Sequence, residues 1–406
     1  MSRSSRLRIA AALAVAAAAL PASADDWPQW RGPARNGISA EAGWLDAWPA
    51  EGPRVLWKAE VGIGFSSFAV ARGRVYTIGH AHDTDTVFCL DADKGHVVWY
   101  HPYPADLGDK FFEGGPTSTP TVDGDRVYTI GKWGDLFCFD AANGKIAWTR
   151  NIATESGLPV PAWGFGGSPA VLGDLLYLNI GEAGIALEKA TGKTVWKSGA
   201  AECGYSTPLP LPGEEPLLLF SSGKAFLAVN SRTGKEAWRV KWMTQYGVNA
   251  ADPVVDGSSV FLSTGYGKGA ALYRTGKAEP ELVWQNRVLR CQMNPPVLLG
   301  GYLYGVDGDA GQKTALKCVE LATGNEKWSQ PLAGSGAVSS AAGSLIVLSG
   351  EGELMIAPAS SEAFKPVARA KILGGKCWTA PVLANGRILS RNAEGQVVCV
   401  DVRKTP

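Results

Sequence analysis

Hydrophobic and polar residues alternate along many short segments of this chain, and the clearest example is LFCFDAANGKIAW at 136–148. Phe137 and Phe139 lie on one side of a predicted strand and their neighbours on the other, which is the two-residue period of a strand packed on both faces. Gly144 suits the turn, because glycine adopts a positive φ at little cost. The segment is therefore predicted to be a hairpin whose second strand carries Trp148.

Similar hairpins recur along the chain, and each carries a tryptophan near its end. Successive tryptophans are separated by 42 to 49 residues, which is the spacing of four-stranded propeller blades. The series consists of Trp57, Trp99, Trp148, Trp196, Trp238, Trp284 and Trp328.

Two more strands precede each hairpin, so each repeat contains strands A, B, C and D in chain order. The last repeat ends before a D strand, and RVLWKAE at 54–60 is predicted to supply it, which removes an open sheet edge. The expected fold is all-β: a single β-propeller of about eight four-stranded blades. Seven blades are the alternative, because the hairpin repeat at 357–373 is degenerate and lacks its tryptophan. The eight A strands are expected near residues 66, 117, 167, 206, 251, 295, 337 and 379.

The repeated D/E/N-x-x-x-(T/N/K)-G-K/N…W hairpin resembles the PQQ-like (pyrroloquinoline quinone) repeat family over residues 53–403. That family includes quinoprotein alcohol dehydrogenase propellers and the propeller of the outer-membrane protein assembly machinery. DDWPQWRGPARNGIS at 25–39 also looks like the N-terminal segment of secreted bacterial members. The resemblance specifies the fold more than the function, since the family contains both enzymes and binding scaffolds.

The N-terminus has the composition of a secretory signal peptide. Three arginines precede an apolar, alanine-rich run at 9–20, and the small residues at 22–24 fit the cleavage rule. The first cysteine is Cys89, so no lipobox follows, and a periplasmic or secreted location is expected. The predicted parts are a signal peptide at 1–24, an N-terminal extension packing on the propeller at 25–52, and the propeller at 53–403.

Charge and hydropathy exclude two classes of partner. Loss of the three arginines of the signal peptide lowers the formal charge from +1 to −2, and the remaining basic residues are scattered. This pattern argues against nucleic acid. No later run approaches the ~18 apolar residues of a membrane span, so no span is expected. The protein is separately expected to be a monomer.

Most of the seven cysteines are predicted to be free and buried rather than paired. Four of them occupy one repeat position, which Ala186 and Ala228 fill in other copies. A position shared by Cys and Ala is a small buried site, and equivalent sites in different blades are too far apart to bridge.

A functional site is expected on the face opposite the regular turns, where the strand A entries at 101–115 and 151–167 are long. Side chains at the mouths of the A strands should surround one end of the central channel. As cofactor-binding candidates we select Trp163, Phe165, Tyr205, Asn249, Arg290, Asn294, Lys376 and Trp378; as metal ligands, Glu113 and Glu202.

Two interpretations of this mouth remain open: an aromatic plug, or a site for a flat aromatic or sugar-like ligand. In the first function class, the protein is a binding or scaffold module for a protein or envelope component. In the second, it is a PQQ- and calcium-dependent dehydrogenase acting on an alcohol or sugar, with Glu113 or Asp109 as base. The vicinal cysteine pair of many such dehydrogenases is absent, so the catalytic residues stay unknown and the first class is favoured.

All four histidines lie between His80 and His101. His80 and His82, with Asp83 and Asp85, have the chemistry of metal ligands. The simpler interpretation is a solvated polar hairpin, and we prefer it.

Overall fold

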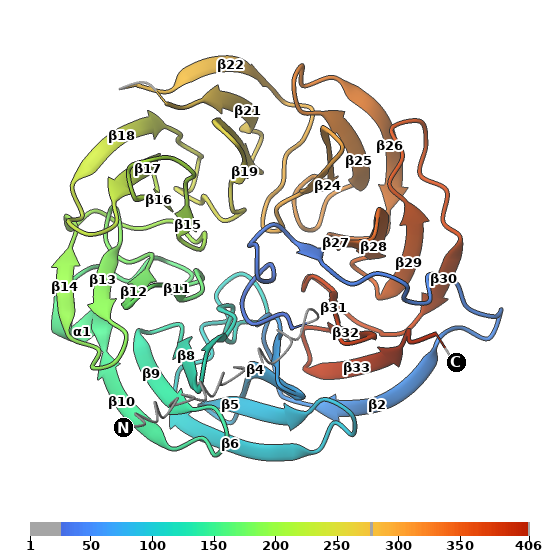
Figure 1. The fold of residues 1–406 in the computed structure, drawn as a ribbon, viewed down its shortest axis with the longest axis horizontal. Coiled ribbons are helices and arrows are strands. Elements are labelled where there is room, and N and C mark those ends of the chain that lie inside the picture. Colours follow the sequence, from blue (N-terminus) through green and yellow to red (C-terminus); the bar gives the residue numbers. More distant parts are fainter. Residues whose placement is uncertain (1–25, 277–278, 405–406) are drawn as a thin grey trace, which may run out of the picture.

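Eight sheets surround a central axis in the computed structural model, which describes residues 26–276 and 279–404 (Figure 1). Neighbouring strands of each repeat pair antiparallel, and the A strands lie nearest the axis. The predicted eight-bladed, all-β propeller is confirmed, and the seven-bladed alternative is wrong. The predicted signal peptide at 1–24 lies outside the described residues.

The first four blades follow one another in chain order, each from the axis outward. Their strands are β3 (Ala69–Ala71), β4 (Arg74–Ala81), β5 (Thr84–Asp91) and β6 (Val97–Pro104); β7 (Thr121–Asp123), β8 (Arg126–Ile130), β9 (Asp135–Asp140) and β10 (Ile146–Asn151); β11 (Ala170–Leu172), β12 (Leu175–Leu178), β13 (Ile185–Glu188) and β14 (Thr194–Lys197); and β15 (Leu209–Pro210), β16 (Leu217–Ser221), β17 (Ala225–Asn230) and β18 (Glu236–Lys241). A short helix, α1 (Ile152–Ser156), follows β10.

The remaining blades continue the ring and close it. Their strands are β19 (Val254–Asp256), β20 (Ser259–Thr264), β21 (Gly269–Arg274) and β22 (Glu281–Asn286); β23 (Val297–Leu299), β24 (Tyr302–Asp307), β25 (Thr314–Glu320) and β26 (Glu326–Leu332); β27 (Ala337–Ala341), β28 (Ser344–Leu348), β29 (Glu353–Pro358) and β30 (Ala368–Lys371), with β1 (Ile38–Ser39) parallel to β27; and β31 (Val382–Ala384), β32 (Arg387–Arg391), β33 (Gln396–Asp401) and β2 (Arg54–Glu60).

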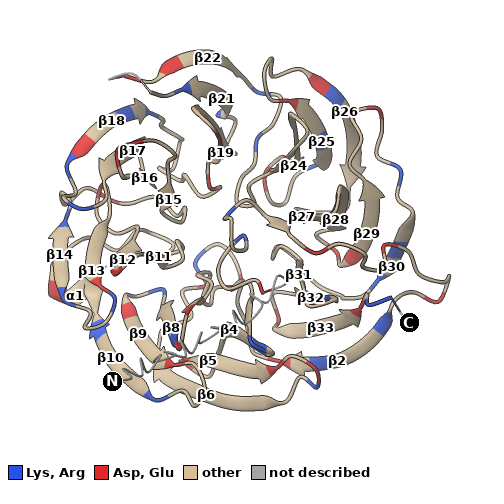
Figure 2. Ribbon diagram, viewed as in Figure 1, with Lys and Arg blue, Asp and Glu red and all other residues tan. Residues whose placement is uncertain are grey.

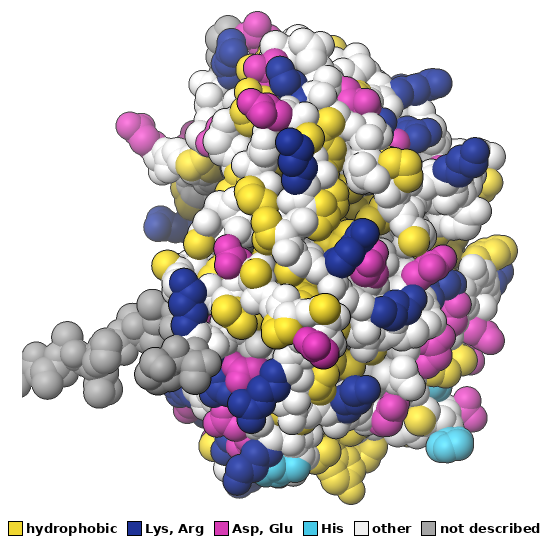
Figure 3. Space-filling model, turned by 90° about the vertical axis from the view of Figure 1, so that its right-hand side faces the viewer, with side chains coloured by type: hydrophobic (Ala, Val, Ile, Leu, Met, Phe, Trp, Pro, Cys, Tyr) yellow, Lys and Arg dark blue, Asp and Glu magenta, His cyan; other side chains and the backbone are white. Residues whose placement is uncertain are grey.

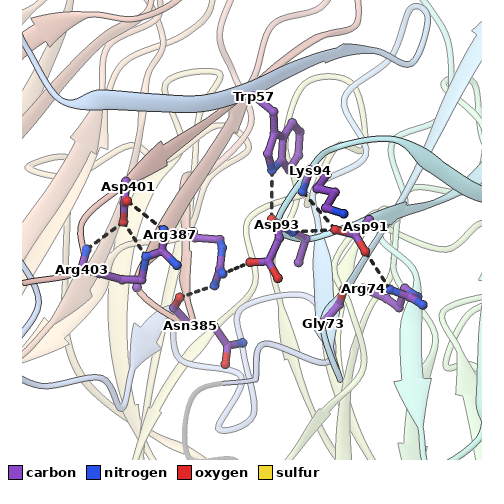
Figure 4. Close-up of polar contacts among 12 residues, drawn as sticks. Trp57, Gly73, Arg74, Asp91, Asp93, Lys94, Asn385, Arg387, Asp401 and Arg403 are labelled. Carbon is purple, nitrogen blue, oxygen red and sulfur yellow. Dashed lines mark hydrogen bonds and ion pairs between the residues drawn. The ribbon is translucent and has the colours of Figure 1, made fainter. Parts of the chain in front are cut away.

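Strand β2 closes the ring, as predicted, by pairing antiparallel with β33, so that Trp57 lies opposite Cys399. In Figure 1 the blue β2 lies beside the red β33. The closing blade is also joined to the first blade: the Trp57 indole donates to the Ala92 carbonyl at 2.9 Å, and Arg387 pairs with Asp93 (Figure 4). The N- and C-terminal ends of the propeller therefore support one another.

The same indole contact recurs between other neighbouring blades. Trp99 donates to the Ala141 carbonyl at 3.0 Å, and Trp148 donates to the Lys189 carbonyl at 3.0 Å. In each case the acceptor lies in the C–D turn of the next blade. Trp196, Trp284 and Trp328 make the same contact. The repeated tryptophan thus joins a blade to its neighbour in most of the copies that carry it, which explains its spacing in the sequence.

The N-terminal extension crosses the axis at the end where the regular turns lie. Trp27 forms a bridge with Val70 of β3, and the Pro28 carbonyl accepts the Val122 amide of β7 at 2.7 Å. The Arg31 guanidinium donates to the carbonyls of Pro295 and Pro296, before β23, at 3.1 and 2.9 Å. These contacts join A strands from opposite sides of the ring.

The opposite face carries the long entries into strand A. The segment after β6 begins at residue 105 rather than 101, because β6 extends to Pro104, and part of the second expected loop is α1. A hydrogen bond from the Ala92 amide to the Gly73 carbonyl joins the C–D and A–B turns of the first blade. Those turns therefore share a face, as the topology predicts, and the long entries lie on the other.

Charged residues of both signs are dispersed over the outer strands and loops (Figure 2). The side that carries β26 and β30 shows basic and acidic side chains mixed with hydrophobic ones (Figure 3). No helix in the described part of the chain is long and apolar enough to span a membrane.

Candidate functional site

A cavity of about 530 Å³ lies on the axis, at the entries of the A strands. Trp30 of the N-terminal extension lines the end of the cavity nearer the A–B and C–D turns. Side chains of the long entries into strand A line the opposite end. We call it the aromatic cup, because much of its wall consists of aromatic rings: Phe65, Phe112, Trp163, Tyr205, Tyr266 and Trp378.

The rings of the cup form contacting groups around the wall. Phe65 stacks on Trp378 with centroids 5.2 Å apart and contacts Phe112 at 5.7 Å. Trp163 meets Tyr205 edge-on at 6.0 Å. These separations are typical of favourable aromatic pairs, so the rings hold one another in place.

Two exposed aromatic rings extend this wall to the surface. Phe111 contacts Trp163 at 6.0 Å and is 75% exposed, and Tyr246 packs edge-on against Tyr266 at 5.4 Å. The rim is thus apolar and accessible from the long-loop face.

A collar of hydrogen bonds surrounds the inner part of the cup. The backbone amides of Ser67, Thr119, Ser168 and Thr207 each donate to a side-chain oxygen of the next blade, at 3.2, 2.9, 3.0 and 2.8 Å. The last acceptor in this series is the carboxylate of Asp252. One repeated position, which precedes a proline in four of the five blades and Phe68 in the first, therefore links these blades in sequence.

Asp252 is buried at the floor of the cup, where it is 7% exposed. One carboxylate oxygen accepts the Thr207 amide, and the other accepts the Trp30 indole N–H at 2.7 Å. Burial raises the pKa of Asp252 to about 6, against the opposing effect of the Arg31 charge. Desolvation prevails because the carboxylate loses more stabilisation by leaving water than the charge of Arg31 and its two hydrogen bonds restore.

Lys376 and Glu113 form an ion pair near the rim, between the last and the second blade. The Lys376 ammonium also lies 4.4 Å from the centroid of Trp378. A second ammonium, that of Lys132, lies 4.5 Å from the centroid of Phe112 and donates to the Gly108 carbonyl at 2.7 Å. Burial lowers the pKa of Lys132 to about 8.

Four of the eight cofactor-binding candidates line the cup: Trp163, Tyr205, Asn294 and Trp378. The Asn294 amide donates to the carbonyls of Gly336 and Trp378 at 3.3 and 2.7 Å, so it braces the wall. Lys376 lies at the rim, as described above.

The other three candidates do not line the cup. Phe165 packs in the core between the second and third blades. The Asn249 side-chain amide donates to the carbonyls of Ser222 and Trp242. Arg290 forms a two-pronged pair with Asp307 at 2.9 and 2.7 Å, outside the wall. Adjacent positions in these irregular entries face different ways, which sequence spacing alone does not resolve.

The metal-ligand candidates Glu113 and Glu202 are not brought together with other ligands. Glu113 is paired with Lys376, and Glu202 is exposed. No group of three or more His, Cys, Asp or Glu side chains suited to a metal occurs among the described residues.

The histidine hairpin divides into two environments. His82 and Asp83 are exposed and have positive φ angles, which fits the preferred interpretation of a solvated hairpin. His80 and Asp85 instead are buried and share a hydrogen bond of 2.8 Å. Burial raises the pKa of Asp85, and the bond to His80 opposes that shift.

Sequence reasoning missed Trp30 and Asp252, the two residues of the floor. A signal for Asp252 was present: in ADPVVD it occupies the position before the strand A proline, where Thr119, Ser168 and Thr207 stand in other blades. Trp30 carried no comparable signal, because the extension is not part of the repeat.

A family model described as outer membrane protein assembly factor BamB matches residues 41–128 and 105–330. No curated protein sequence matches the chain. Among solved structures, BamB from Moraxella catarrhalis is 15% identical and covers 86% of this chain and 99% of its own, with a TM-score of 0.64.

Quinoprotein dehydrogenases have similar folds. A quinohemoprotein alcohol dehydrogenase from Comamonas testosteroni is 13% identical and covers 95% of this chain and 82% of its own, with a TM-score of 0.70. A europium-containing methanol dehydrogenase is 13% identical and covers 93% and 89%, with a TM-score of 0.62. At these identities the likeness concerns the fold alone.

Proposed function

Because this chain belongs to the PQQ-like propeller family whose model is described as outer membrane protein assembly factor BamB, we propose that it is an exported binding module. Its aromatic cup and long-loop face receive an apolar group of a small ligand or of a protein or envelope partner. The N-terminal composition supports export, and the cup supports binding.

The observation that carries this proposal is an apolar cavity whose polar wall groups are already engaged. The Gln292 side-chain amide donates to the Tyr266 hydroxyl and accepts the Ala310 amide. Asn294 and Asp252 are likewise bonded within the protein. A sugar, which needs many hydrogen bonds, is therefore disfavoured relative to an apolar or aromatic guest.

The residues of the cup do not fit the alternative, a PQQ- and calcium-dependent dehydrogenase. PQQ is a tricarboxylate and needs cationic partners. Among residues 26–276 and 279–404, however, no Lys or Arg lines the cup, and the one acidic residue that does is Asp252. Arg290 and Lys376 are engaged by Asp307 and Glu113. With Glu113 in that pair, the described residues also offer no clustered carboxylates for calcium.

A neutral aromatic dye, N-phenyl-1-naphthylamine, tests the proposal by fluorescence titration of the purified mature protein. We expect saturable binding that weakens about tenfold or more in Trp163→Ala and Trp378→Ala, because each variant removes a large apolar face. Tyr100→Ala is the control, since Tyr100 is exposed on β6. Absence of dye binding would refute the cup as a binding site.

The enzymatic alternative has its own measurement. Absorbance spectra and calorimetry with PQQ and calcium, followed by dye-reduction assays across alcohols and sugars, should give no uptake and no turnover. Micromolar PQQ uptake lost in Trp163→Ala, together with dye reduction, would replace the binding proposal by the dehydrogenase.

A further inference from the structure

Asp252 is the one charged residue among the described residues that line the aromatic cup. The rest of this lining consists of aromatic, apolar and small polar residues, and it includes no Lys or Arg. A single carboxylate beneath several ring faces makes an environment of negative potential, because aromatic faces carry the negative part of the ring quadrupole.

The cations near the cup are balanced or turned to other partners. The Arg31 guanidinium lines a separate small cavity beside Trp30 and donates to backbone carbonyls, among them those of Pro295 and Pro296. Lys376 is paired with Glu113, and the Lys132 ammonium binds loop carbonyls. Among the described residues, Asp252 thus remains the one charged side chain that lines the cup itself.

The geometry points to an organic cation as the ligand of the cup: a quaternary or protonated amine with an apolar or aromatic body, its charge held between the Asp252 carboxylate and the surrounding rings. This inference rests on the proposed binding function and specifies its ligand class. Cations bind favourably within ~6 Å of a ring centroid, and more strongly where water is excluded.

Two rings of the cup already lie within this distance of ammonium groups that belong to the protein's own lysines. Lys376 lies 4.4 Å from the Trp378 centroid, and Lys132 lies 4.5 Å from that of Phe112. A cavity of about 530 Å³ is large enough for a drug-sized guest. A bulky ammonium ion with an attached ring therefore matches both the size and the polarity of the cup.

The test is calorimetric titration of the mature protein with benzyltrimethylammonium, with neutral pivalophenone of similar size and with phenylacetate as an anion. We expect the cation to bind about tenfold or more tightly than the neutral compound, and phenylacetate to bind most weakly. Tyr100→Ala serves as the unaffected surface control.

Asp252→Asn should reduce the affinity for the cation about tenfold while leaving that for pivalophenone within about twofold. Because Asp252 also holds Trp30 and the Thr207 amide, circular dichroism and retained pivalophenone binding check that the variant is folded.

The wild-type protein offers an independent test that requires no variant. Burial raises the pKa of Asp252 to about 6, so cation affinity should fall as the pH is lowered from 7.5 to 5, while pivalophenone affinity stays constant. The pKa values of Cys291, Tyr205 and Tyr266 are raised by burial, which keeps these groups neutral in that range. The other charged and titratable groups around Asp252 and the cup come from every side of it. They are Arg31, Cys291, Tyr205, Tyr246 and Tyr266, with the Lys376–Glu113 pair at the rim, Lys132 over Phe112, Asp309 beside Tyr266 and Glu202 near Tyr205.

The outcomes separate this inference from the proposed function. Equal binding of cation and neutral compound, or cation preference unchanged in Asp252→Asn, would overturn the inference and leave the binding cup intact. Absence of binding by every probe, including the naphthylamine dye, would overturn both. Cation preference that depends on Asp252 and on pH would support both.

Discussion

Individual glycines and tryptophans determine how each blade meets the next. Gly144 has a φ of +71° in the C–D turn of the second blade, and a Cβ built there would lie 2.6 Å from Cδ2 of Trp99. The turn therefore needs glycine at this position for two reasons: its backbone has a positive φ, and the Trp99 indole leaves no room for a side chain. Gly95 beside Trp57 and Gly192 beside Trp148 repeat this arrangement.

Gly144→Ala is predicted to destabilise the protein more than Gly124→Ala. Gly124 lies in the A–B turn of the same blade with a φ of +59° and has nothing within 4 Å of its built Cβ. Both variants incur about 1–2 kcal/mol of left-handed strain, and Gly144→Ala adds about 1–3 kcal/mol of overpacking. Urea unfolding measures the difference in stability. Equal unfolding midpoints would contradict the close contact between Gly144 and Trp99.

Asp252 makes stability depend on pH in a direction unusual for a carboxylate. Its pKa is raised from 3.8 to about 6 by burial, so the folded state binds more protons than the unfolded state between these values. Stability contributed by this group is therefore lost as the pH rises from about 4 to about 6, by about 3 kcal/mol in total.

Asp252→Asn should remove this contribution. Thermal unfolding from pH 4 to pH 7 should show the stability of the variant improving relative to the wild type as the pH rises through 6. A constant difference across that range would mean that Asp252 has an ordinary pKa in the folded protein.

At the residue level, the sequence predicts what repeats more completely than it predicts which side chains face the channel. The Cys/Ala position was predictable because it recurs, and Cys138 and Ala186 both lie buried opposite a repeat tryptophan. Arg290 was misplaced because its partner, Asp307, comes from a neighbouring B strand. Only three-dimensional pairing reveals which charges are already engaged.

At the level of elements, ring closure depends on one strand from the beginning of the chain and one buried cation from the end. Arg391 is fully buried in β32, and it donates to the carbonyls of Gly62, Ser66 and Ile78 near the first blade. Burial without a carboxylate lowers its pKa to about 9. The sequence predicted the strand, because the last repeat lacked one, but it gave no sign of the arginine.

Deleting residues 54–60 is predicted to destabilise the propeller and promote aggregation. The deletion leaves β33 as an unpaired edge and exposes the apolar contacts of Trp57. Light scattering and thermal unfolding measure the effect. The matched control replaces the exposed residues 49–51 with glycine and serine and leaves the N-terminal extension and β2 in place. A monomeric variant of unchanged melting temperature would refute closure by β2.

At the scale of the whole molecule, the blades are joined by packing and hydrogen bonds, and the described cysteines take no part in covalent links. All seven thiols are buried and free. Burial raises their pKa values, for instance to about 12 for Cys89 and Cys399 and to about 11 for Cys318. A buried thiol with a high pKa reacts slowly, since the thiolate is the reactive form.

The native protein should therefore react slowly with Ellman's reagent at pH 8. After unfolding in guanidinium, its seven thiols should release seven equivalents of thionitrobenzoate from the reagent. Reductant should leave the melting temperature unchanged, because the ring contains no bond for it to break. The unfolded wild type supplies the full count within the same experiment. Two results together would contradict this prediction: fewer than seven thiols after unfolding without reductant, and a melting temperature that falls when reductant is added. They would show that disulfides contribute to the ring and that packing between the blades is not sufficient to hold it.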